Sequence, residues 1–178
     1  MMIAAMDVHY FETGCTAACV LFSDYRDRRP SASYTRILPT PADYVPGEFY
    51  RRELPCIVTL LQQINPLPDE IVIDGYVMLG DSPGLGQHLF KYLDSKISVV
   101  GVAKSKFKGS FGIEVFRGKS TRPLYITSAG IDQQKAAEKI RTMHGAYRIP
   151  TILKQADILA REKAREMVFY NHPCASAD

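Results

Sequence analysis

Glu70-Ile71-Val72-Ile73-Asp74-Gly75 sets three β-branched residues in succession between two acids. A short apolar run without alternation predicts a strand that is buried on both faces of a sheet. A second run of this kind covers residues 97–103. Because Asp74 closes the first strand, we expect it at the mouth of the sheet, where open α/β sheets bind ligands.

Strands and helices are also predicted on both sides of this run. Three strands precede it, over residues 3–10, 16–24 and 33–38, and a helix with apolar periodicity covers residues 48–64. After it, the pattern predicts helices over residues 84–93, 131–143 and 151–166, and strands over residues 111–116 and 124–127. This order predicts an α/β fold of one domain, a mixed sheet flanked by helices as in ribonuclease-H-like nucleases.

Composition sets the broad class of the protein. The 178 residues are 46% apolar and 23% charged, and the net charge of +3 permits a polyanionic partner without indicating one. The four cysteines have neither Cys-x-x-Cys nor zinc-finger spacing. No segment approaches the ~20 apolar residues of a membrane span, and Asp7 directly follows the apolar start. We therefore expect a cytoplasmic protein, with a monomer favoured.

Acids occur at positions where burial of a charge is costly. Asp7 interrupts an apolar strand, Asp74 ends another, and Asp157 stands beside apolar positions of the last helix. Glu53 belongs to the helix of residues 48–64. Carboxylates suit hard divalent ions, which can activate water and stabilise the leaving oxygen of a phosphodiester. The alternative for each acid is a helix cap, a turn or a salt bridge.

Three basic or aromatic residues could contact the substrate or assist catalysis at such a site. Lys104 ends the run of residues 99–103 and could hold a scissile phosphate, or be an ordinary surface lysine. His9 shares a strand face with Asp7 and could assist proton transfer, or merely hydrogen-bond a neighbouring segment. Tyr44 precedes a Pro-Gly turn and could contact nucleic acid, or pack under its loop.

A series of short motifs extends along nearly the whole chain. They are Met6-Asp7-Val8, Tyr44-Val45-Pro46-Gly47, Arg52-Glu53-Leu54-Pro55, Asp74-Gly75, Gly101-Val102-Ala103-Lys104 and the segment from Arg148-Ile149-Pro150 to Ala156-Asp157. In this combination the chain resembles the endonuclease V family of deoxyinosine-specific repair nucleases. The resemblance implies a nuclease domain over residues 1–170 and a C-terminal tail over residues 171–178.

The resemblance also implies roles for individual residues. Asp7, Glu53 and Asp74 would bind Mg²⁺, with Mn²⁺ possible, and Asp157 would complete the catalytic site. Lys104 would contact phosphate. Substrate contacts would come from Tyr44, Pro46, Gly47 and Gly75, with Tyr44 in the wedge that fills the gap left by the extruded base. The implied partner is DNA, or RNA, that contains inosine or damaged bases, and the implied product is a nick 3′ to the lesion.

One motif of the family is missing. Family members usually have a His-Pro-Arg stretch soon after Asp-Gly, and no histidine stands within residues 76–84 here. The closing segment has Pro150-Thr151 but no Pro-Glu-Pro-Thr. Two alternatives to a DNA endonuclease therefore stay open: a catalytically weak nucleic-acid-binding module of the same fold, and a nuclease acting on inosine-containing RNA.

Overall fold

A mixed sheet forms the centre of the protein, in a computed structural model that describes the backbone of residues 1–39 and 50–171 and the side chains of these ranges up to residue 166. The strand order in the seven-stranded sheet is β3-β2-β1-β4-β7-β9-β8. β1, β4 and β7 are parallel neighbours, and the remaining pairs are antiparallel. The bounds are β1 Ile3–Phe11, β2 Gly14–Phe22, β3 Ala32–Pro39, β4 Glu70–Asp74, β7 Ser98–Ala103, β8 Ile113–Val115 and β9 Leu124–Ala129.

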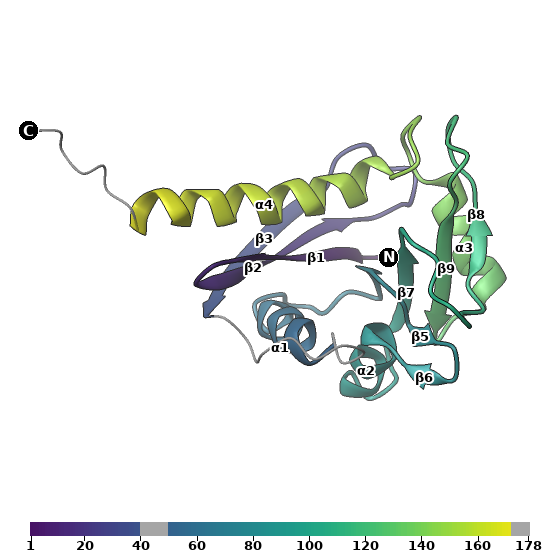
Figure 1. Cartoon of the computed structure of the whole chain (residues 1–178), viewed down its shortest axis with the longest axis horizontal. Coiled ribbons are helices and arrows are strands. Elements are labelled where there is room, and N and C mark those ends of the chain that lie inside the picture. Colours follow the sequence, from purple (N-terminus) through teal and green to yellow (C-terminus); the bar gives the residue numbers. More distant parts are fainter. Residues whose placement is uncertain (40–49, 172–178) are drawn as a thin grey trace, which may run out of the picture.

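Helices cover both faces of this sheet (Figure 1). Helices α1 (Tyr50–Leu61) and α2 (Leu85–Tyr92) pack on one face. Helices α3 (Gln133–Thr142) and α4 (Thr151–Asn171) pack on the other. The sheet is therefore the middle layer of three, which explains why its central strands are apolar on both sides.

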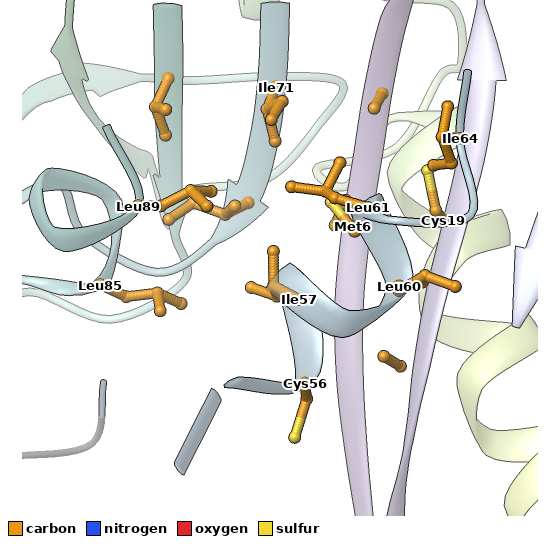
Figure 2. Packing of buried hydrophobic residues seen from close by; sticks show 14 of the residues in the cluster. Met6, Cys19, Cys56, Ile57, Leu60, Leu61, Ile64, Ile71, Leu85 and Leu89 are labelled. Atoms are coloured by element: carbon orange, nitrogen blue, oxygen red, sulfur yellow. The ribbon is translucent and has the colours of Figure 1, made fainter. Parts of the chain in front are cut away.

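The first core layer lies between α1, α2 and the sheet (Figure 2). Ile57 and Leu60 of α1 are fully buried, and Leu89 of α2 faces the same cluster. One thiol contact adds to this layer, because the Cys15 and Cys56 Sγ atoms lie 3.1 Å apart. The helix that carries Glu53 packs against β2 through this cluster.

Small residues let α4 approach the opposite face closely. Ile152, Ala156, Ala160 and Ala164 are buried at intervals of four residues, one row on the helix surface. This row faces β1 and β2, on which α4 makes most of its contacts. The close approach brings the N-terminal half of α4 over the strand that contains Asp7.

A buried ion pair joins α3 to the amino end of β4. Glu70 is only 3% exposed and accepts hydrogen bonds from Ser98 Oγ at 3.0 Å and Lys139 Nζ at 2.8 Å. The Tyr25 hydroxyl also donates to it. With these partners the charge of Glu70 is compensated, so removing one of them would leave a buried charge unpaired at the sheet end opposite Asp74.

The predicted fold class is confirmed, and the differences concern element bounds. β2 begins at Gly14 rather than Thr16, and β8 keeps only three of the six predicted residues. Helix α4 continues to Asn171, and a small hairpin of β5 (Met78–Leu79) and β6 (Ser82–Pro83) was not predicted. Residues 172–178 lie outside the described part. Among the described residues, no helix has the length and apolar character needed to cross a membrane.

Candidate active site

Strand register brings Asp7 and Asp74 to the same level of the sheet. In the parallel pair of β1 and β4, Met6 lies opposite Ile73, so the two aspartates follow at matching positions. In the next parallel pair, Asp74 lies opposite Val102, two residues before Lys104. Neighbouring strands are ~4.8 Å apart, so Asp7, in the middle of β1, lies level with the carboxyl ends of β4 and β7, where Asp74 and Lys104 stand.

Alternation along the strands turns these three side chains to one face. Ala5, Val72 and Val100 belong to the core beneath α3 and α4. Because side chains repeat with period two, Asp7, Asp74 and Lys104 are directed to that same face. The Lys104 Nζ atom lies 2.5 Å from Asp74 Oδ2, in a pair that is partly exposed.

A large cavity opens at this edge, between the middle of β1, the ends of β4 and β7 and the first turns of α4. This α4 cavity has a volume of about 790 Å³, and Asp7, Asp74, Lys104 and Asp157 all line it. Asp157 stands in the second turn of α4, where its Oδ1 accepts a hydrogen bond from Arg161 Nε at 2.9 Å. Four of the five residues predicted as catalytic therefore share one cavity.

Charges within the cavity perturb the titration of Asp7. Burial raises the pKa of this carboxyl to about 7, with further increases from the nearby Asp74 and Asp157 charges and a decrease from Lys104. Burial alone would lower the pKa of Lys104, but its hydrogen bond to Asp74 and the surrounding carboxylates raise it. An acid that is hard to ionise among other acids is typical of functional sites.

Glu53 approaches this cluster from the other side of the sheet. It belongs to α1, is 7% exposed, and is not among the residues that line the α4 cavity. Its pKa is raised well above the ordinary value by burial, and then by the charges of Asp7 and Asp74. Glu53, the fifth residue predicted as catalytic, is therefore electrostatically coupled to Asp7 and Asp74 but belongs to a helix in a different layer.

The donor set suits a hard divalent ion with an incomplete protein shell. Within residues 1–39 and 50–166, no three His, Cys, Asp or Glu side chains are grouped closely enough to hold an ion by themselves. Mg²⁺ commonly binds through one or two carboxylates, with waters and substrate phosphate oxygens completing its shell. Asp7 and Asp74, neighbours at one cavity wall, meet that requirement, and a cation there would offset their mutual repulsion.

A smaller cavity lies on the α2 side of Asp74. This α2 cavity has a volume of about 250 Å³ and is lined by Asp74 and Gly75 together with Tyr50, Tyr76, Leu79, Gly84, Leu85 and Phe107. Gly75 has a φ of +130°, a conformation that L side chains rarely adopt. Asp74 is thus shared by two cavities, one on each side of the strand end.

Two residues that support the site were not singled out from the sequence. The Arg148 guanidinium donates to the Lys104 carbonyl, and also to the Pro123 carbonyl at 2.7 Å. The Tyr76 hydroxyl donates to the Ser105 carbonyl at 2.8 Å and accepts from the Phe107 N–H at 3.1 Å. Both fix the backbone that follows β7. Arg148 stands in a quoted motif, but no sequence pattern links it to Lys104.

The remaining candidates are placed less fully. Tyr44, Pro46 and Gly47 lie outside the described residues, so their proposed substrate contacts stay predictions. His9 shares the Asp7 face of β1 but is not among the residues that line the α4 cavity. Burial lowers its pKa, as does the neighbouring Arg161 charge, against an opposing effect of Asp157. His9 therefore lies beside α4 and outside the α4 cavity.

Comparison with known proteins identifies the family. The family model described as Endonuclease V matches residues 1–116, more than half of the chain. This protein belongs to the endonuclease V family. The resemblance in motif order is thereby confirmed, and membership of this family implies a nuclease.

Curated relatives extend the match beyond the family model. An endonuclease V of Rhodospirillum centenum is 28% identical over 183 residues, which cover 86% of this chain and 74% of the relative. One from Nostoc punctiforme is 27% identical over 184 residues, with coverages of 90% and 82%. The similarity to endonuclease V proteins therefore continues beyond residue 116 and includes Arg148 and the start of α4.

Solved structures of the family share the fold. Human ENDOV superposes with a TM-score of 0.80 at 24% identity, covering 94% of this chain and 85% of the human one. An endonuclease V from Ciona intestinalis, in complex with a 23mer DNA containing an inosine followed by a ribo-adenosine, gives 0.78 at 17% identity, with coverages of 93% and 86%. The ribonuclease-H-like arrangement of this family member is thus confirmed.

Proposed function

We propose that this protein is a divalent-metal-dependent endonuclease that nicks DNA near deoxyinosine or a related base lesion, in DNA repair. The observation that carries the proposal is the meeting of Asp7, Asp74, Asp157 and Lys104 in the α4 cavity. Three acids and one lysine in one cavity combine groups for a cation with a group for phosphate. The DNA bound by the Ciona intestinalis relative supports the choice of substrate.

Each residue has a distinct part in this proposal. Asp7, Asp74 and Glu53 would hold Mg²⁺ or Mn²⁺, with Glu53, whose pKa is raised by the charges of the other two, reaching the ion from the α1 layer. A bound ion would supply Lewis acidity, lowering the pKa of water and neutralising charge on the phosphate. Lys104 pairs with a non-bridging phosphate oxygen, for which its ion pair with Asp74 already holds it in place.

The raised pKa of Asp7 has a direct consequence for this mechanism. Near neutral pH much of the Asp7 carboxyl is protonated, and an ion can bind only its ionised form. Ion binding should therefore release a proton and strengthen as pH rises through 7. Arg148 keeps the Lys104 backbone in position through its bond to the Lys104 carbonyl.

A nicking assay tests the proposal. A labelled duplex with one deoxyinosine, its RNA counterpart and an undamaged duplex are incubated with Mg²⁺, Mn²⁺ or a chelator. We expect a nick in the deoxyinosine duplex with either metal, and none with the chelator. Asp74→Asn should abolish it, whereas Asp94→Asn should leave it intact, because Asp94 is an exposed acid paired with Lys96 far from the cavity.

One observation keeps a second function under test. No histidine stands between Tyr76 and Gly84, so a binding module without useful turnover remains the competing function. Tight binding of the deoxyinosine duplex without a nick under any metal would replace the enzyme with that module. Faster cleavage of the RNA substrate would instead assign the activity to inosine-containing RNA.

A further inference from the structure

The α4 cavity extends well beyond the acids. Its outer part is formed by two loops and α4: Lys119 from the β8–β9 connection, Tyr147 and Arg148 from the loop before α4, and Lys154 from the first turn of α4. Its floor is apolar, with Ile149 and Leu153. The roles proposed for the acids and Lys104 leave these outer residues without a function.

The outer part is positively charged. Lys119 and Lys154 are exposed, and neither forms an ion pair with any acid among the described residues. Arg148, which bonds two backbone carbonyls, adds a third cation with no carboxylate partner in the described part. This arrangement suits an extended polyanion: one phosphate would contact an ion bound at the acidic cluster, and others would contact the cations of the outer part.

An aromatic ring is presented beside these charges on a rigid support. Tyr147 is 77% exposed, although it lines the cavity. Its loop is fixed by Arg117, whose guanidinium donates to the Met143 carbonyl at 2.5 Å and the Gly145 carbonyl at 3.1 Å. Gly118, with a φ of +57°, allows the neighbouring loop to touch the Ala146 carbonyl. An exposed ring on a loop whose backbone is held in place is available for stacking.

We propose that this outer part binds one nucleotide of the cleaved strand, with its base stacked on Tyr147 and its phosphates paired with Lys119 and Lys154. Asp74 separates the α2 cavity from the α4 cavity. A phosphodiester at Asp74 therefore joins a nucleotide on the α2 side to one in the outer part of the α4 cavity. Apolar floor, aromatic ring and cations are the combination that single-stranded nucleic-acid sites use. The inference rests on the proposed function and extends its substrate site.

Binding experiments test the site separately from catalysis. Fluorescence anisotropy on a deoxyinosine duplex, with Ca²⁺ in place of Mg²⁺, gives affinity across a range of salt concentrations. The double variant Lys119→Ala/Lys154→Ala should bind more weakly and lose about 2 from the slope of log affinity against log salt, about 1 for each lysine. Lys96→Ala, an exposed lysine at the amino end of β7, serves as matched control and should leave the slope unchanged.

Stacking is tested by fluorescence of the base itself. 2-Aminopurine is placed at each of the three positions on either side of the inosine, and its quenching on binding is measured. We expect strong quenching at one position, retained by Tyr147→Phe and lost in Tyr147→Ala, with affinity roughly 5- to 150-fold weaker in the alanine variant. Tyr92→Ala removes another exposed tyrosine, at the end of α2, and should change neither value.

Two outcomes overturn the proposal in distinguishable ways. If the parent protein nicks DNA while the Tyr147 and lysine variants keep its affinity, salt slope and quenching, the outer part binds no nucleotide and the proposed function stands. If the parent protein binds no nucleic acid at all, the proposed function and this site fail together.

Discussion

Replacing Asp7 with asparagine should stabilise the metal-free protein at neutral and higher pH. The pKa of Asp7 is about 7 in the folded protein, against an ordinary value of 3.8. The pKa difference is about 3, and each pKa unit corresponds to about 1.4 kcal/mol. The ionised carboxylate of Asp7 is therefore about 4 kcal/mol less favourable in the folded protein than in the unfolded chain. Because the pKa of Asp7 is higher in the folded than in the unfolded protein, its protonated form favours folding. This contribution of Asp7 to the free energy of unfolding is complete below pH 4 and is lost as pH rises through 7.

The assay is urea unfolding of the parent protein and Asp7→Asn, with a chelator, from pH 5 to pH 8. Between pH 5 and pH 8 the free energy of unfolding of the parent should fall relative to the variant by about 3 kcal/mol, most of it below pH 7, and then level off. Differences between two proteins cancel groups that titrate alike in both, such as His88. Glu53 is coupled to Asp7, so the pair is repeated in a Glu53→Gln background.

Metal provides the second half of this test. Mg²⁺ should stabilise the parent protein more at pH 8 than at pH 6, because it binds the ionised carboxylate. The asparagine variant should show little of that stabilisation. A constant difference in stability between parent and variant from pH 5 to pH 8 would refute the reasoning, since Asp7 would then titrate as an ordinary exposed acid.

Other substitutions probe the substrate side of the site. Lys104→Ala should weaken DNA binding and reduce its salt slope by about 1; an unchanged slope would make Lys104 an ordinary surface lysine. Arg148→Met removes donors to the Lys104 and Pro123 carbonyls, so it should lower kcat more than it raises KM, with partial rescue by Arg148→Lys. Tyr44→Ala should reduce preference for the lesion more than overall affinity, and equal losses on both duplexes would contradict a role in the base stack. His9→Ala should lower turnover more than binding if His9 assists proton transfer; a rate within about twofold, ~0.4 kcal/mol in barrier, would exclude that role.

Local sequence patterns were enough to predict the layers and the two buried strands that lead to Asp74 and Lys104. The unbroken apolar runs before Asp74 and Lys104 identified strands buried on both faces, because hydrophobic periodicity reflects the immediate surroundings of each residue. Asp7 was recognisable because an acid within such a strand is costly without partners. Element ends were less accurate, and helix α4 continued five residues beyond its predicted end.

Contacts between distant segments were beyond any local pattern. That Asp7 and Asp74 lie level depends on the parallel register of β1 and β4, which the helices and loops between them make possible. That Glu53 arrives from the opposite layer depends on which face α1 covers. The bond from Arg148 to the Lys104 carbonyl spans 44 residues. The face on which a side chain lies follows from the local period of its strand or helix. The wall of a cavity is formed by segments that are far apart in the sequence and are brought together by hydrophobic packing, so the spacing of residues in the sequence does not predict it.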